Sequence, residues 1–100
     1  MLYTKLGEHV ILSCTAIGGN DLTISWYYAE NIEAETLKVQ IYEESEALSD
    51  VTSKVVSTLN IRNAEMRHDG LWTCKSSEST PSRTIQQLIT LDIFGNKSFF

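Results

Sequence analysis

The chain has 100 residues, of which 42% are hydrophobic, and its formal net charge is −5. This length supports one compact domain with a single core and is too short for two. The acidic balance and the eight scattered basic residues argue against a nucleic-acid surface, and no apolar run reaches the roughly 18 to 20 residues of a membrane-spanning helix.

Short stretches in which apolar and polar residues alternate follow one another along the chain, and turn-forming residues separate them. In chain order, this pattern predicts strands over residues 2–7, 9–16, 22–29, 37–42, 52–62, 70–75 and 84–94. Residues 30–36 are expected to form an acidic loop, with a short helical turn as the alternative, and residues 76–83 a loop rich in Ser and Thr. Strands of this length, without a convincing helix, favour an all-β sandwich. We expect residues 1–95 to form the domain and residues 96–100 a tail or linker.

The alternation also predicts which side chains face the core, because successive side chains in a strand point to opposite faces. After Gly70, Trp72 and Cys74 share the inner face, whereas Leu71 and Thr73 face solvent or a partner. The other residues expected in the core are Val10, Leu12, Cys14, Ala16, Ile24, Trp26, Tyr28, Val55, Ser57, Leu59, Ile61, Ala64, Met66, Ile85, Ile89, Leu91 and Ile93. Seven of the thirteen acidic residues lie between residues 30 and 50, so this stretch must be largely solvated.

Four motifs follow one another along the chain, namely Cys14, Trp26, Leu59-Asn60-Ile61 and Gly70-Leu71-Trp72-Thr73-Cys74. Their order resembles that of the immunoglobulin superfamily. The resemblance implies a two-sheet antiparallel sandwich whose core signature includes Trp26, Trp72, Leu59 and Ile61. It also implies a disulfide between Cys14 and Cys74 that joins the sheets, with the tryptophan packed against it. The alternative is a pair of buried thiols, as in a cytosolic relative.

Two residues depart from the family pattern Asp-x-Gly-x-Tyr-x-Cys. His68 occupies the Asp position, with Asp69 displaced by one, and Trp72 replaces the tyrosine. An indole offers only one N–H donor, so the corner must be held differently. Either His68 hydrogen-bonds in place of the carboxylate, or Asp69 turns inward. Residues 84–94 lack the Gly-x-Gly bulge of antibody-like variable domains, so the chain is more similar to intermediate-type or C2-type domains of adhesion molecules and receptor ectodomains.

No constellation of residues predicts catalysis, a cofactor or a metal site. His9 and His68 are the only histidines, no Ser, His and Asp set has a spacing typical of a triad, and the carboxylates lack the Gly-containing calcium loop. We therefore expect a protein that is not an enzyme. Asn96-Lys97-Ser98 matches the N-glycosylation acceptor, which would make Asn96 a modification site in a secreted glycoprotein.

Protein binding is the function that remains, and the outward phase predicts a mixed apolar and polar face. Its candidate residues are Tyr27, Leu71, Thr73, Lys75 and Leu88. Scattered surface hydrophobics are the alternative. Edge pairing by the final strand is a second route to a dimer.

The resemblance implies an extracellular or cell-surface module for adhesion, receptor or ligand recognition in signalling. Its partner would be another cell-surface or secreted protein, or a second copy of the chain. The alternative from another functional class is an intracellular structural module similar to those of muscle-filament proteins, which share the same fold residues.

Overall fold

The computed structural model describes residues 1–79 and 82–95, and these residues form short strands with two brief 3₁₀ turns. The strands are β1 (Leu2–Lys5), β2 (Val10–Gly18), β3 (Thr23–Tyr28), β4 (Ile32–Glu33), β5 (Gln40–Ala47), β6 (Ser53–Ile61), β7 (Gly70–Ser79) and β8 (Ser82–Phe94). The 3₁₀ helices are η1 (Ala34–Leu37) and η2 (Met66–His68). None of the helices in the described ranges has the length and apolar character that crossing a membrane requires.

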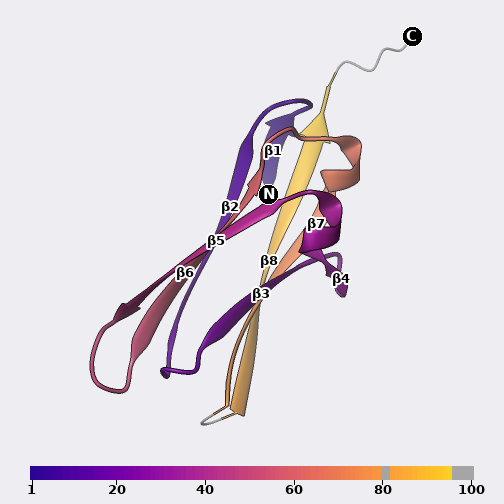
Figure 1. Ribbon diagram of the computed structural model, residues 1–100. Helices are drawn as coiled ribbons and strands as arrows, with labels where there is room; N and C mark the ends of the chain where they lie inside the picture. Colours follow the sequence, from indigo (N-terminus) through magenta and orange to yellow (C-terminus); the bar gives the residue numbers. More distant parts are fainter. Residues whose placement is uncertain (80–81, 96–100) are drawn as a thin grey trace.

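The strands form two sheets that pack face to face (Figure 1). The first sheet has five strands in the order β1-β8-β7-β3-β4, and the second has three in the order β2-β6-β5. β1 pairs in parallel with the end of β8, while every other pair is antiparallel. The predicted all-β sandwich is therefore confirmed.

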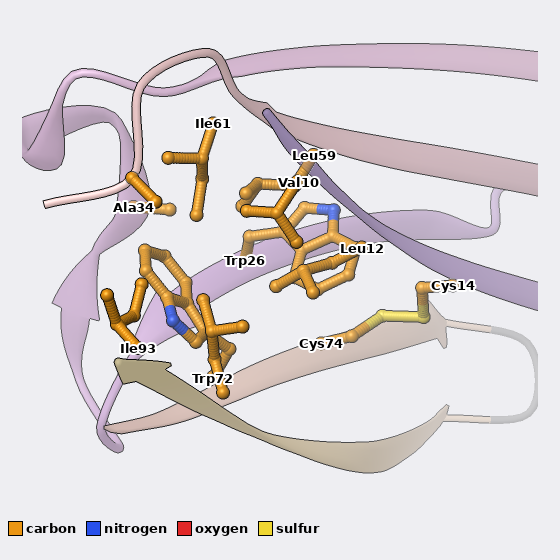
Figure 2. Close-up of a cluster of buried hydrophobic side chains, with 12 residues drawn as sticks. Val10, Leu12, Cys14, Trp26, Ala34, Leu59, Ile61, Trp72, Cys74 and Ile93 are labelled. Carbon is orange, nitrogen blue, oxygen red and sulfur yellow. A yellow bond between two sulfur atoms is a disulfide. The ribbon is translucent and has the colours of Figure 1, made fainter. Parts of the chain in front are cut away.

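One cluster of buried side chains lies between the sheets, and a disulfide crosses it (Figure 2). Cys14 of β2 is bonded to Cys74 of β7, with 6.5 Å between their Cα atoms. In the same cluster the Trp26 indole is 2% exposed and donates from Nε1 to the hydroxyl of Ser57 at 2.9 Å. The hydroxyl thus satisfies a polar group that would be costly to bury unpaired. The predicted inter-sheet disulfide is confirmed.

Alternation predicted the inward residues of β6 correctly. Val55, Ser57, Leu59 and Ile61 are all buried, with exposures of 3% or less. Their register explains the pattern, because each lies opposite an inward residue of β2 across the ladder. Burial of an aliphatic side chain such as Val55, Leu59 or Ile61 stabilises the fold by about 1.5–3 kcal/mol, so these three residues are a main source of stability.

Two core assignments are wrong. The Met66 side chain is 50% exposed, because it lies in η2 at the surface while its neighbour Ala64 fills the interior. Ile85 is 49% exposed although its strand phase is inward, opposite Ser76. The core cluster contains Leu91 and Ile93 of β8, and Ile89 packs against it. Ile85 lies nearer the start of β8 and is not part of that cluster, so its side chain stays exposed.

The predicted loops also differ from the structure. Residues 76–79 and 82–83 belong to strands and not to a loop: β7 continues to Ser79 and β8 begins at Ser82, with Glu78 directly opposite Arg83. This oppositely charged cross-strand pair stabilises the continued ladder. In the predicted acidic loop, residues 32–37 instead form β4 and η1, so the alternative of a short helical turn fits better. β5 runs on to Ala47 because its acidic residues lie on a solvated edge.

Candidate functional site

The predicted partner-binding residues come together on the outward face of the five-stranded sheet. Tyr27 of β3 lies opposite Thr73 of β7, which in turn lies opposite Leu88 of β8. These three residues form one row across neighbouring strands. Lys75 and Leu71 flank the row on β7, one on each side of Thr73.

The members of this face differ in how much surface they offer. Leu88 of β8 is 62% exposed, whereas Leu71 and Lys75 of β7 are half-buried. Thr73 is only 1% exposed, and its hydroxyl donates to the carbonyl of Ala29 at 2.7 Å. Its side chain is short and stands between longer neighbours, so Thr73 forms the floor of the face rather than a contact surface.

A shallow hollow lies beside the protruding Leu88 side chain. It has a volume of about 330 Å³ and is lined by Glu30, Leu71, Thr73, Lys75, Gln86 and Leu88. The Lys75 ammonium lies 4.6 Å from the centroid of the Tyr27 ring, in a cation–π contact that orients both side chains. Sequence reasoning missed Glu30 and Gln86. Pairing could have indicated Gln86, which lies opposite Lys75, whereas Glu30 follows the strand and carries no such signal.

The strand that carries this face is anchored at its start by the departures from the family pattern. The Trp72 indole donates to the carbonyl of His68 at 2.9 Å, in place of the tyrosine hydroxyl. Asp69 accepts the backbone N–H of Ile93 at 2.8 Å, and its own carbonyl accepts the hydroxyl of Tyr28. Asp69 thus ties β7 to both of its neighbours, β3 and β8.

His68 bonds with both ring nitrogens and is 1% exposed. Nδ1 accepts the backbone N–H of Glu65 at 3.0 Å, so Nδ1 carries no proton. Nε2 lies 2.9 Å from the carbonyl of Leu37 and must therefore be the nitrogen that donates. Both expected alternatives occur together: His68 hydrogen-bonds at the corner, and Asp69 also turns inward.

The opposite end of β7 is held by two carboxylates. Glu78 accepts the backbone N–H of Gly19 at 2.9 Å and the Arg83 guanidinium at 2.7 Å, and these contacts lower the pKa of its carboxyl. Asp21 accepts both the hydroxyl and the N–H of Ser79, which lowers its pKa as well. Together they fasten the turn between β2 and β3 to the paired strand ends that contain Glu78, Ser79 and Arg83.

Edge pairing by the final strand is restricted by its neighbours. β7 pairs along β8 on one side, and β1 covers Leu91–Phe94 on the other. The edge of Ser82–Thr90 that faces away from β7 has no strand partner in the part of the chain that the structure describes. The expected dimerisation route therefore applies to that half of β8 alone.

The described residues offer no cluster of three or more His, Cys, Asp or Glu side chains that could hold a metal ion. Both cysteines belong to the disulfide. The candidate glycosylation residue Asn96 lies outside the described residues.

A family model described as an immunoglobulin domain matches residues 2–77, a range that contains both cysteines and both tryptophans. No curated protein matches the chain.

Proposed function

This chain belongs to the immunoglobulin domain family, and on that premise we propose that it is an extracellular recognition module that binds another cell-surface or secreted protein without catalysis. Domains of this family are generally protein-interaction modules. The proposed contact surface is the outward face of the five-stranded sheet around Leu88.

The observation that carries this proposal is the row of Tyr27, Thr73 and Leu88 on three paired strands. Leu88 is 62% exposed, so its side chain can enter a pocket on a partner protein. The hollow beside it can accept a side chain of that partner. The underlying ladder is rigid, so little conformational entropy is lost on binding. Tyr27 belongs to a residue type that is enriched at protein interfaces.

The disulfide supports the extracellular part of the proposal. Disulfides persist in oxidising compartments and are rare in the cytosol. An intracellular filament-type module, the competing function, would keep Cys14 and Cys74 as thiols, whereas the two cysteines are bonded to each other in this structure.

A screen followed by a matched pair of variants tests the proposal. The immobilised domain is screened against a panel of cell-surface and secreted ectodomains that includes the domain itself. For each partner found, Leu88→Glu is compared with Ile11→Glu, because Ile11 is 53% exposed but lies in β2, in the other sheet. We expect Leu88→Glu to weaken binding by at least about tenfold and Ile11→Glu to leave it unchanged. The reverse pattern would place the interface on the three-stranded sheet.

A further inference from the structure

A cleft lies between the two sheets, where β3 of one sheet and β5 of the other both line it. Its volume is about 350 Å³. Ile24 and Trp26 of β3 line it from one sheet, and Ile41 of β5 lines it from the other. The isoleucines are half-buried and Trp26 is 2% exposed, so this lining is a continuation of the core that reaches the surface.

The cleft is bordered by backbone that lacks a strand partner. Among the residues that the structure describes, β4 pairs only with Tyr27 and Tyr28, so the edge of Thr23–Trp26 on the cleft side has no strand partner there. β5 is the last strand of its sheet, and its outer edge is also open within the described part of the chain. Unpaired N–H and C=O groups on such edges accept an added strand through main-chain hydrogen bonds.

Three carboxylates surround the apolar lining. Glu33 comes from β4, Glu35 from η1 and Glu43 from β5. All three are exposed, and none forms an ion pair with a basic residue in ranges 1–79 and 82–95. The negative charge of the cleft is therefore not neutralised from within the described chain.

Register shows how β5 presents this chemistry. Glu43 lies opposite Ser57, whose hydroxyl is bonded by the Trp26 indole of the facing sheet, so the Glu43 side chain lies on the inner phase. Ile41 shares that phase, opposite Leu59. The next residue, Glu44, lies opposite Val56 and belongs to the outer phase. Along the open edge, an aliphatic and an acidic side chain thus stand two positions apart on the cleft side.

We propose that this cleft binds an extended cationic segment of a partner protein, added as a strand on the β5 edge. Side chains directly opposite each other across a ladder interact. The segment therefore carries an aliphatic residue opposite Ile41 and, two positions away, a lysine or arginine opposite Glu43. The bound cation also meets the carboxylates of Glu33 and Glu35 across the cleft. The formal charge of −5 further favours a basic partner over a second copy of this chain.

A short peptide serves as the probe. It is the capped, fluorescently labelled sequence Thr-Val-Thr-Lys-Thr-Val-Thr, in which valine and lysine are two positions apart whichever way the strand runs. The control peptide Thr-Thr-Val-Lys-Val-Thr-Thr has the same composition, but it places lysine and valine on opposite faces of a strand. Anisotropy titration is expected to show saturable binding of the first peptide below about 1 mM and at least threefold weaker binding of the second.

Variants of the domain complete the test. Glu43→Gln is expected to weaken binding about three- to fivefold, in line with the loss of one exposed ion pair, and combining it with Glu33→Gln and Glu35→Gln to weaken it by about tenfold or more. Glu44→Gln removes the same charge from the neighbouring position of β5 and is the matched control, with less than about a twofold effect expected. All these carboxylates are exposed, so the variants are expected to fold.

Three results would overturn the proposal: no saturable binding, equal binding of the two peptides, or equal weakening by Glu43→Gln and Glu44→Gln. The last result would mean that the peptide senses only the net charge of the domain. The assay does not involve Leu88, so a failure here would leave the proposed function of the outward sheet face unaffected.

Discussion

His68→Ala is predicted to lower the free energy of unfolding strongly, because the His68 ring bonds two backbone groups and also stacks on an indole. The ring accepts one backbone hydrogen bond from Glu65 and donates another to Leu37, and it stacks on Trp72 with centroids 6.4 Å apart. Alanine would leave a backbone donor and a backbone acceptor without their partners. Each such loss costs about 1–3 kcal/mol when buried.

The expected total is about 2–4 kcal/mol, the lower part of the summed range, because both bonds are only partly buried and water replaces some of what is lost. This is a large share of the about 5–15 kcal/mol that stabilises a typical domain. Urea-induced unfolding at neutral pH, with the disulfide intact and tryptophan fluorescence as the signal, measures the difference directly.

His9→Ala is the matched control for this experiment. His9 is exposed and lies 3.0 Å from the side-chain oxygen of Asn60, so its loss is expected to change stability by less than about 0.5 kcal/mol. If His68→Ala were no more destabilising than His9→Ala, the structural role assigned to the His68 ring would be refuted.

Three further changes test other parts of the fold. Replacing both Cys14 and Cys74 by alanine is expected to lower the free energy of unfolding by about 4 kcal/mol on the chain-entropy model, since the bond spans 60 positions. Urea unfolding of the variant and the parent measures this difference, and an unchanged midpoint would contradict it. Gly70→Ala is expected to cost about 1–3 kcal/mol in thermal unfolding, because Gly70 has φ +131° and an added Cβ would lie 2.7 Å from the Tyr28 hydroxyl; an unchanged Tm would argue against this geometry. Because the pKa of Glu78 is lowered in the folded state, its carboxylate stabilises the fold above the ordinary pKa of the group, and this stabilisation is lost as pH falls through the folded-state pKa. In Glu78→Gln the urea midpoint should therefore fall less steeply on acidification than in the parent. An identical pH profile would exclude the contribution.

Side-chain alternation was enough to predict the sandwich and most of its core. Ser57 is the instructive residue, because strand phase placed this polar side chain inside, and it is there to accept the Trp26 indole. The family resemblance, carried by residues such as Cys14, Trp26 and Cys74, predicted the disulfide between the sheets. Alternation is visible within each strand segment, and the order of the family motifs is visible along the chain, so a single sequence is enough to recognise both.

The remaining features depend on contacts between distant segments. The bond of His68 to the carbonyl of Leu37 joins residues 31 positions apart, and no motif marks it. The exposure of Thr73 depends on the size of its neighbours, so strand phase predicted its direction but not its burial. β5 continues through acidic residues because pairing with β6 overrides their weak strand pattern. The cleft beside Glu43 is lined by residues of both sheets, which the pattern within a single strand does not bring together.

We propose that this domain works outside the cell as a recognition module, and the redox state of its two cysteines in the native protein tests this proposal. The protein is isolated from its native source and denatured, and its mass is measured after thiol alkylation with and without prior reduction. We expect Cys14 and Cys74 to gain no alkyl group until the bond is reduced. Direct alkylation of both cysteines without reduction would contradict it and favour an intracellular filament-type module.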